Sequence, residues 1–453
     1  MRRRGSGGSG SGGRTGNPAQ VIALAFAAGI LVGTGLLALP AASATPEGAG
    51  VLDALFTATS AVCVTGLTTV DTGSSWSTLG HVVIAALMQV GGLGIMTVAS
   101  LLVVLVSRRL GLRARLVARA QSGTNLDLSD VRRVLRDVVL FSLAGEALTA
   151  LALGLRLLLA YDAEPADALW EGAFHAVSAF NNGGFVLWPE GMARFAGDPW
   201  MLLPVALAVI AGGLGFPVIF ELARSRRPGS WSVTTRITVL TSGALLVAGT
   251  ALLIALEYGN PATLGPMGVP GKLLAGFFSA VMPRSGGFST VDVGSMTPES
   301  WLATDVLMFI GGGSASTAGG IKVTTFGLLA VVLWSEVRGE ADVDVARRRI
   351  PEANQRQALA VALLGVGLAL ASTFALLGLT EHDTDRVLFE ALSALGTVGL
   401  STGITSDLPA VAEVLLVVLM FVGRLGPLAL ASALALRERP RLYRRPEERT
   451  IIG

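Results

Sequence analysis

Residues 56–67 read FTATSAVCVTGL, and the same pattern recurs as FHAVSAFNNGGF at 174–185, FFSAVMPRSGGF at 277–288 and FEALSALGTVGL at 389–400. In each stretch a phenylalanine precedes small and apolar residues that lead into a short turn centred on glycine. The four glycines lie ten residues after their phenylalanine and directly before a leucine or phenylalanine; they are Gly66, Gly184, Gly287 and Gly399. A motif that recurs at a constant offset indicates an internal repeat.

The composition places the chain in a membrane. Of its 453 residues, 52% are hydrophobic and 15% are charged, whereas soluble domains carry about a quarter charged residues. Three histidines and the single Cys63 exclude an internal disulfide and most His/Cys metal clusters. The 57 glycines need a separate structural reason, because each costs about 1 kcal/mol relative to alanine in a helix interior.

Eight stretches are apolar and long enough to cross a bilayer, which requires about 20 residues. They lie near 20–43, 79–107, 136–160, 199–223, 236–257, 302–335, 357–379 and 409–436. Between the members of each successive pair lies a shorter apolar stretch, near 51–63, 169–181, 271–284 and 386–396. These are too short to span, so re-entrant half-helices or interfacial segments are expected. The predicted fold is an all-α polytopic membrane protein with four pseudo-repeats of helix, pore half-helix and helix around one central pore.

The repeats set the predicted organisation of the chain. They cover 19–107, 133–224, 235–335 and 356–436. Residues 1–18 are basic and rich in Gly and Ser, which predicts a flexible cytoplasmic tail; a cleaved signal peptide is the alternative. Residues 437–453 are predicted to form a second cytoplasmic tail.

Arginines set the predicted orientation. They gather in the loops 107–136, 224–236 and 338–356 and in the tail after residue 436, whereas the alternate loops carry mainly acidic residues. By the positive-inside rule, both termini and the arginine-rich loops are expected in the cytoplasm. The net charge of +2 therefore reflects topology and gives no indication of nucleic-acid binding.

The glycine turns predict a pore. Irregular backbone at membrane depth is tolerated where it is buried in protein or lines a watery cavity. Four such turns around one axis would place backbone carbonyl oxygens on one central path, and rings of carbonyls replace the hydration shell of an ion in potassium filters. The half-helices would direct their negative C-terminal ends at this path, which favours a cation. Close helix packing is the alternative role for small residues, but four copies at one offset favour the pore.

Beyond the first 18 residues, the sequence resembles the Trk/Ktr/HKT superfamily of potassium-translocating membrane proteins, and most closely the bacterial KtrB-type pore subunit. The resemblance lies in SAVCVTGL at 60–67, GGLGIMT at 91–97, FHAVSAFNN at 174–182, PRSGGF at 283–288, GGGSASTAGGIK at 311–322, SALGTVGL at 393–400, GRLGPL at 423–428 and RPEER at 445–449. Some relatives have an extra pair of spans before the first repeat. Their absence here favours the KtrB type over the longer TrkH type.

The resemblance implies a K⁺ selectivity filter in the four turns. Its residues are Val64, Thr65, Gly66, Leu67, Asn182, Gly183, Gly184, Phe185, Ser285, Gly286, Gly287, Phe288, Thr397, Val398, Gly399 and Leu400. Relatives that pass mainly Na⁺ often have serine in the first copy, so Gly66 favours K⁺. The residue before the glycine differs among the turns, which predicts a less uniform filter than in fourfold-symmetric channels.

The resemblance also implies a gating loop in the second span of the third repeat. The loop residues are Gly311, Gly312, Gly313, Ser314, Ala315, Ser316, Thr317, Ala318, Gly319 and Gly320. So many glycines make a poor helix, and a broken helix under the filter would block the cavity; a simple packing kink is the alternative. Arg424 is implied to contact the loop. Lys322, one of two lysines in the chain, either does the same or extends toward the cytoplasm.

Other polar residues within apolar stretches receive structural interpretations. His175 is expected to make a structural hydrogen bond, because one histidine is not a metal site. Glu146 is expected to pair with a basic loop residue or a neighbouring helix. Asn181 and Asn182 are expected to brace the second turn through side-chain bonds to backbone.

Cofactor and partner expectations follow from the same residues. No strand followed by G-x-G-x-x-G is present, so no organic cofactor is expected on this chain. The resemblance implies a separate KtrA-like cytosolic ring that binds ATP or ADP, a homodimer of the pore subunit, and the inner membrane of a bacterium. K⁺ is the expected cargo and Na⁺ a candidate activator.

Three alternative functions remain open at this point. The first is symport of K⁺ with Na⁺ or H⁺. The second is a membrane enzyme, which would need clustered acidic, histidine or nucleophilic residues that the spans lack. The third is a non-conducting receptor or scaffold, which would leave the four glycine turns without a purpose.

Overall fold

The computed structural model describes residues 18–44, 48–118, 128–225, 227–340, 342–345 and 348–436. The predicted tail 437–453, with its 445–449 motif, and all but the last residue of the predicted tail 1–18 lie outside these ranges.

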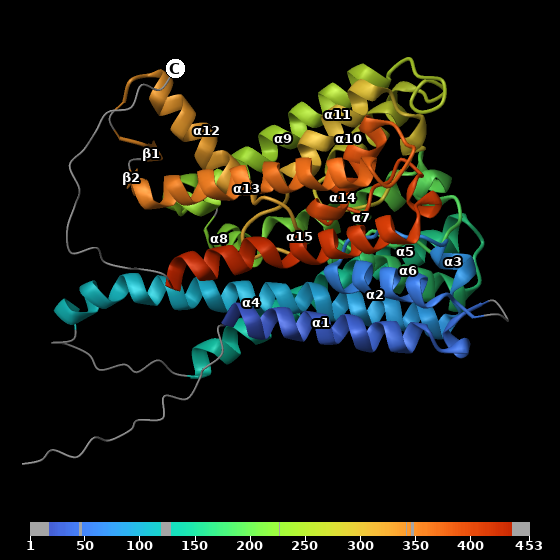
Figure 1. The fold of residues 1–453 in the computed structure, drawn as a ribbon, viewed down its shortest axis with the longest axis horizontal. Coiled ribbons are helices and arrows are strands. Elements are labelled where there is room, and N and C mark those ends of the chain that lie inside the picture. Colours follow the sequence, from blue (N-terminus) through green and yellow to red (C-terminus); the bar gives the residue numbers. More distant parts are fainter. Residues whose placement is uncertain are drawn as a thin grey trace, which may run out of the picture.

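Helices make up most of the described chain (Figure 1). Four helices that each precede a shorter one are α1 (Pro18–Leu37), α5 (Leu128–Ala160), α9 (Val233–Glu257) and α13 (Glu352–Leu377). The shorter ones are α2 (Val51–Cys63), α6 (Pro165–Phe180), α10 (Val269–Val281) and α14 (Thr384–Gly396). The chain then returns along α4 (Thr78–Ala118), α7 (Pro199–Leu214) with α8 (Phe216–Arg224), α11 (Pro298–Phe309) with α12 (Val323–Val337), and α15 (Ala410–Leu436).

Short elements connect these helices. They are α3 (Thr72–Ser75), the single turns η1 (Pro40–Ala42), η2 (Gly191–Phe195), η3 (Pro228–Ser230), η4 (Val293–Ser295) and η5 (Thr405–Asp407), and the strands β1 (Asp344–Val345) and β2 (Arg348–Arg349). The two strands pair antiparallel, with Asp344 opposite Arg349. The predicted helical membrane fold is confirmed, with this small hairpin as an addition.

The short helices join neighbouring parts of the bundle into a ring. Each packs on the helix before it, and α2, α6 and α14 also pack on the returning helix that follows them. All four contact the returning helix of the preceding group as well: α6 with α4, α10 with α7, α14 with α11, and α2 with α15. The last pair closes the ring between the two ends of the chain. In Figure 1 the four short helices occupy the same half of the bundle.

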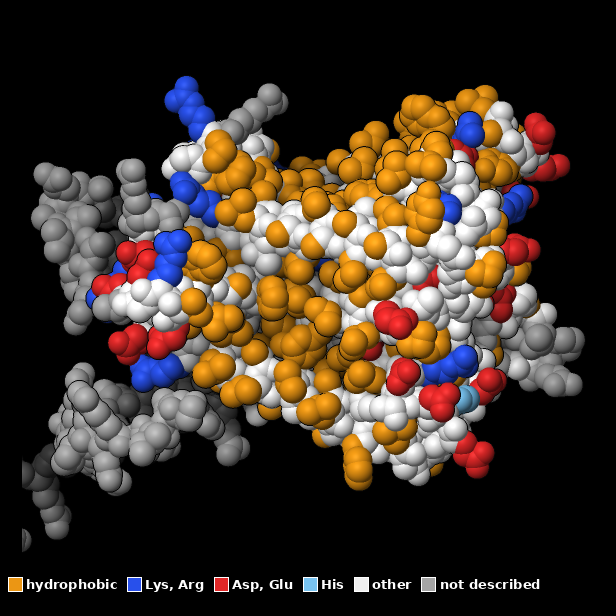
Figure 2. Space-filling view, turned by 90° about the horizontal axis from the view of Figure 1, so that it is seen from above, with side chains coloured by type: hydrophobic (Ala, Val, Ile, Leu, Met, Phe, Trp, Pro, Cys, Tyr) orange, Lys and Arg blue, Asp and Glu red, His pale blue; other side chains and the backbone are white. Residues whose placement is uncertain are grey.

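The outside of the bundle is apolar. Leu24, Leu148, Val247 and Phe374, on α1, α5, α9 and α13, have exposed fractions of 70%, 71%, 71% and 81%. Figure 2 shows hydrophobic side chains across the middle of one face and charged side chains toward its two ends. This is the arrangement of a protein whose outer solvent is lipid.

By length and composition, five of the described helices can each cross a membrane, and a sixth span counts if the bent pair α7–α8 is taken together. That pair bends by 100° at Gly215, whose φ is 92°, so the apolar stretch predicted near 199–223 forms two helices instead of one straight span. The bend makes room for the segment between α11 and α12. The Phe216 N–H donates to the Ala315 carbonyl at 3.4 Å, and a Cβ on Gly215 would strike the Ser314 carbonyl.

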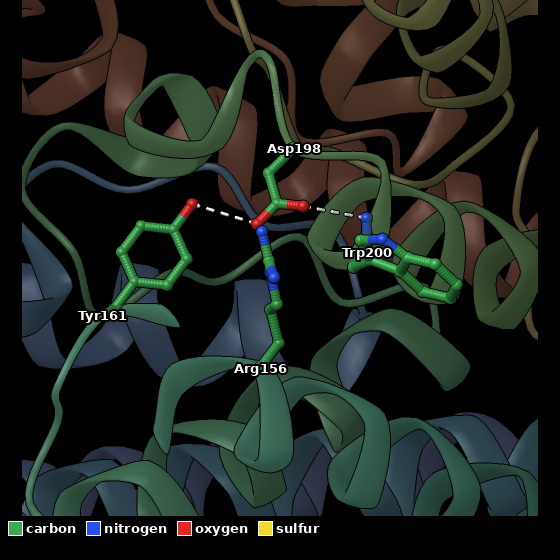
Figure 3. A network of polar contacts seen from close by, with 4 residues as sticks. All are labelled: Arg156, Tyr161, Asp198 and Trp200. Atoms are coloured by element: carbon green, nitrogen blue, oxygen red, sulfur yellow. Dashed lines mark hydrogen bonds and ion pairs between the residues drawn. The ribbon is translucent and has the colours of Figure 1, made fainter. Parts of the chain in front are cut away.

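A polar network fixes the start of α7 beside the end of α5 (Figure 3). The Asp198 carboxylate is 7% exposed. It accepts hydrogen bonds from Arg156 Nε at 2.7 Å, from the Tyr161 hydroxyl at 3.0 Å and from the Trp200 N–H at 2.9 Å. Partial burial opposes ionisation, but these hydrogen bonds and the charge of Arg156 outweigh it and lower the pKa of Asp198 below its ordinary value.

This network predicts a pH-dependent contribution to stability. Because the pKa of Asp198 is lower in the folded protein than in the unfolded chain, the carboxylate stabilises the fold above the unfolded value of about 3.9. The contribution is lost as the pH falls through that value toward the folded one. Asp198→Asn should lower the free energy of unfolding by about 1–3 kcal/mol at neutral pH. Thermal denaturation in detergent should show a steeper loss of stability at acid pH for the wild type than for Asp198→Asn; parallel curves would contradict this.

Candidate functional site

Four turns with left-handed backbone follow the short helices directly. In each turn two residues have positive φ: Val64 (56°) and Gly66 (95°), Asn182 (62°) and Gly184 (70°), Ser285 (72°) and Gly287 (75°), Thr397 (46°) and Gly399 (95°). The second residue is always the glycine singled out by the sequence. Glycine adopts such φ values without a steric penalty from Cβ, which explains its presence there.

The four glycines pack against one another around one point. A Cβ built on Gly66 would lie 3.0 Å from the Cα of Gly184, and one on Gly184 would lie 3.0 Å from the Cα of Gly287. A Cβ on Gly287 would lie 2.7 Å from the Val398 carbonyl oxygen and 3.5 Å from the Cα of Gly399. A Cβ on Gly399 would lie 3.0 Å from the Cα of Gly66, which completes the circle. The structure thus brings all four quoted stretches to one place.

The electrostatics of this place suit a positive charge. Each short helix ends within four residues of the first residue with positive φ in its turn; the helix ends are Cys63, Phe180, Val281 and Gly396. The C-terminal end of a helix carries a partial negative charge, so four such ends surround the glycines. At Thr65 and Thr397, both fully buried, the side-chain hydroxyl has no hydrogen-bond partner among the described residues.

Serines on the short helices hold the turns, a role that the sequence analysis missed. The Ser60 and Ser393 hydroxyls accept the N–H groups of Gly66 and Gly399 at 2.9 Å and 3.1 Å. Ser178, at the same offset in the second stretch, donates to the Phe185 carbonyl at 2.9 Å. The third stretch has Val281 there. The sequence contained a signal for this role, because a serine lies four residues after the phenylalanine in three of the four stretches.

His175 and Glu390 play matching roles one residue after their phenylalanines. His175 contacts the Glu171 carbonyl through Nδ1 at 2.7 Å and accepts the Leu187 N–H at Nε2 at 3.1 Å. Its role is structural, as expected. Glu390 accepts the Thr402 N–H and the Thr405 hydroxyl, both at 3.1 Å, and the Ser401 hydroxyl. Each of these side chains links the segment that follows a turn to the short helix that precedes the same turn.

The segment between α11 and α12 is a folded-back loop. Its two arms are joined because the Gly311 N–H donates to the Ile321 carbonyl and the Val323 N–H donates to the Gly312 carbonyl, each at 2.9 Å. The loop is also tied to the end of α7: the Gly313 N–H donates to the Gly213 carbonyl at 2.7 Å and the Thr317 N–H to the Gly212 carbonyl at 3.2 Å. These bonds replace the helical ones that the glycines disfavour.

The tip of the loop lies against the glycine turns. The Thr317 hydroxyl donates to Asn182 Oδ1 at 2.9 Å, and the Gly319 N–H donates to the Ser285 hydroxyl at 3.2 Å. A Cβ on Gly319 would strike the Thr397 hydroxyl. The loop therefore contacts the second, third and fourth turns.

Two basic side chains, Arg424 and Lys322, also bind the loop. Arg424 on α15 is 3% exposed; it donates through one amino group to the Thr317 carbonyl and through the other to the Gly91 carbonyl at 3.4 Å. The ammonium of Lys322 donates to the Ala318 carbonyl at 2.5 Å. Both residues thus contact the loop backbone.

Glu146 pairs with neighbouring helices through the amides of Gln89 and Asn181 and with Ser142 on its own helix. Gln89 Nε2 donates to both carboxylate oxygens at 2.9 Å and 3.1 Å, and the Ser142 hydroxyl donates at 2.8 Å. Asn181 Nδ2 donates to Gln89 Oε1 at 2.7 Å and to the Val177 carbonyl at 3.0 Å. The expected brace of the second turn is wrong for both residues: the Asn181 amide bonds the backbone of α6 at Val177, and Asn182 Oδ1 accepts from a side chain, the Thr317 hydroxyl.

Comparison with known proteins identifies the family and the fold. The sequence model of one family, described as TrkH, cation transport protein, matches residues 20–442. The chain is 38% identical over 438 residues to Ktr system potassium uptake protein B of Bacillus subtilis, covering 96% of this chain and 97% of that protein. It is 37% identical over 441 residues to the protein of the same name from Vibrio alginolyticus, covering 97% and 95% of the two chains. The crystal structure of the potassium transporter TrkH from Vibrio parahaemolyticus has the same fold, with a TM-score of 0.69 at 21% identity over 95% of this chain and 86% of that one.

Proposed function

The chain belongs to the TrkH family of cation transport proteins, and from this premise we propose that it is the K⁺-translocating membrane subunit of a Ktr-type potassium uptake system. It is a multi-pass membrane transporter rather than an enzyme, like its relatives. The observation that carries the proposal is the circle of four glycines, each with positive φ and each in contact distance of the next. Carbonyl oxygens of the four turns replace the hydration shell of K⁺ as it passes.

The proposed conduction path runs through the four turns to the loop. The filter comprises residues 64–67, 182–185, 285–288 and 397–400, contributed by four repeats at 19–107, 133–224, 235–335 and 356–436. The membrane potential drives the ion inward and is worth about 2.3 kcal/mol per charge per 100 mV. The loop 311–320 is the gate, because its tip contacts three of the turns from one side. Arg424 and Lys322 hold it closed through its carbonyls.

The proposal extends to the surroundings of the pore. Two copies associate in a bacterial cytoplasmic membrane with both termini in the cytoplasm. A KtrA-like cytosolic ring that binds ATP or ADP biases the loop toward its open or closed position. The names of the Bacillus and Vibrio relatives, each designated protein B of a Ktr system, support a multi-component assembly.

The test is uptake of radioactive rubidium into liposomes that hold the purified protein, with excess K⁺ or Na⁺ as competitor. We expect K⁺ to suppress uptake and Na⁺ to leave it nearly unchanged, because the filter coordinates the larger ion. The same assay with and without Na⁺ decides between independent K⁺ flow and coupling to, or activation by, Na⁺. A variant that lacks the loop tip serves as a second sample, so that a closed pore is distinguished from no pore. Absence of selective uptake by both samples would contradict the proposal.

A further inference from the structure

Glu146 is a buried carboxylate beside the second turn. It lies on α5 and is 7% exposed. Its oxygens accept from Gln89 Nε2 at 2.9 Å and 3.1 Å, from the Ser142 hydroxyl at 2.8 Å and from Asn181 Nδ2 at 3.2 Å. Asn181 directly precedes Asn182, the first residue with positive φ in that turn. One asparagine side chain therefore connects the carboxylate to the backbone of the proposed filter.

The hydrogen bonds around this carboxylate suit its ionised form. Each polar group that contacts it acts as a donor, and the Oε1 atom of Gln89 already accepts from Asn181 Nδ2 at 2.7 Å. An ionised carboxylate only accepts hydrogen bonds, whereas a protonated one has a hydrogen to donate. The arrangement thus places a negative charge beside the second turn.

No basic side chain neutralises this charge among the residues that the structure describes. Their ion pairs do not include Glu146. Arg424, the buried base on α15, donates instead to the carbonyls of Gly91 and Thr317. A charged side chain inside a membrane is costly and commonly marks the path of an ion. A cation in the filter is the positive charge that the proposed function places near Glu146.

The network around Glu146 is separate from the loop 311–320. Its side chains come from α4, α5 and α6, and none of its hydrogen bonds involves a loop residue. Withdrawal of the loop therefore leaves the carboxylate and its donors in place, and the charge acts on an ion that passes through the open pore.

We propose that Glu146 determines the affinity of the filter for its cation, because its negative charge attracts the ion at the second turn whether the loop is docked or withdrawn. This inference rests on the proposed function of the turns. The attraction is stronger in a protein interior than in water, and it scales with the charge of the ion. A divalent cation of about the size of K⁺, such as Ba²⁺, therefore gains twice the free energy from Glu146.

Glu146→Gln tests the inference, since it removes the charge and nearly preserves the shape. The measurement is isothermal titration calorimetry of the purified full-length protein with K⁺ and with Ba²⁺, in a buffer whose other cation is N-methylglucamine. We expect the dissociation constant of K⁺ to rise about fivefold, as for a partly screened charge, and that of Ba²⁺ to rise by the square of this factor, about 25-fold. A distorted turn would not produce this squared relation.

Exchange of two side chains supplies the rescue, and it does not depend on Ba²⁺. Glu146→Gln combined with Gln89→Glu returns a carboxylate to the same network, because Gln89 Nε2 contacts both oxygens of Glu146. The K⁺ constant of this double variant should return close to that of the wild type. Glu257→Gln is the matched control. Glu257 is also buried, at 2% exposed, but it accepts from Thr263 and Thr297, outside the turns, so its K⁺ constant should be unchanged.

The outcomes separate this inference from the proposed function. Wild-type protein that binds K⁺, together with an unchanged K⁺ constant in a folded Glu146→Gln variant, would overturn the inference alone. Equal fold-changes for K⁺ and Ba²⁺ would do the same, because they indicate a change of shape. If Glu146→Gln shows no melting transition, the double variant takes its place, and K⁺ binding that is weakened despite the retained charge would overturn the inference. Wild-type protein without saturable K⁺ binding would overturn the proposed function itself.

Discussion

Replacement of Gly66 by serine should lower the K⁺/Na⁺ permeability ratio by at least about tenfold, which corresponds to about 1.4 kcal/mol of lost discrimination. Gly66 has φ 95°, and a Cβ on it would lie 2.6 Å from the Gly183 carbonyl oxygen and 3.0 Å from the Cα of Gly184. Both obstacles are backbone atoms of the neighbouring turn. The serine therefore forces two turns apart, and the carbonyls no longer match the radius of K⁺.

Gly243→Ser is the control for this result. Gly243 lies in α9, and a Cβ on it would meet nothing within 4 Å. The same change of residue type should leave the ratio as in the wild type. The measurement is the reversal potential or the paired K⁺ and Na⁺ flux of reconstituted protein. A Gly66→Ser variant that folds and keeps the wild-type ratio would remove Gly66 from the filter.

Deletion of residues 312–318 should raise K⁺ flux by about tenfold or more, as expected for a gate whose open state is a minor population of about 10% or less. The deletion removes the Thr317 carbonyl that accepts from Arg424, but it leaves the ends of the chain close together, because the two arms of the loop already lie side by side. A Cβ on Gly311 would strike the Gly319 carbonyl and would lie 3.4 Å from the Cα of Gly320. A single peptide bond from Gly311 to Gly319 can therefore close the gap while Ile310 and Ile321 keep their bridge.

Flux into liposomes and the melting temperature of the same preparation are the two readouts. Wild-type flux with an intact melting transition would show that the segment packs the bundle instead of gating the pore.

Much of this arrangement was predictable because periodic signals carry it. The four short stretches near 51–63, 169–181, 271–284 and 386–396 correspond to α2, α6, α10 and α14. Apolarity marks a helix in lipid, and its length separates a span from a half-span. The glycines at constant offset located the turns, since a repeated backbone conformation requires a repeated residue type.

The remaining features depend on contacts between segments far apart in the chain, which no local pattern encodes. The bend at Gly215 arises because the loop near Ala315 occupies the space that a straight helix would need. The bond from Thr317 to Asn182 joins residues separated by 135 positions. The Asn182 amide was expected to bond local backbone, as asparagine commonly does, but a distant hydroxyl reaches it.

The ring of short helices has a consequence for how the protein is made. A chain is synthesised from its N-terminus, so α2 enters the membrane long before α15, the returning helix of the last group that it contacts. Until the last group docks against the first, the face of α2 that packs on α15 is uncovered. Thr65 and Gly66 then lack their contacts with Gly399. The circle of glycines therefore closes only after the fourth group docks against the first, and a nascent chain halted before α14 contains three of the four turns.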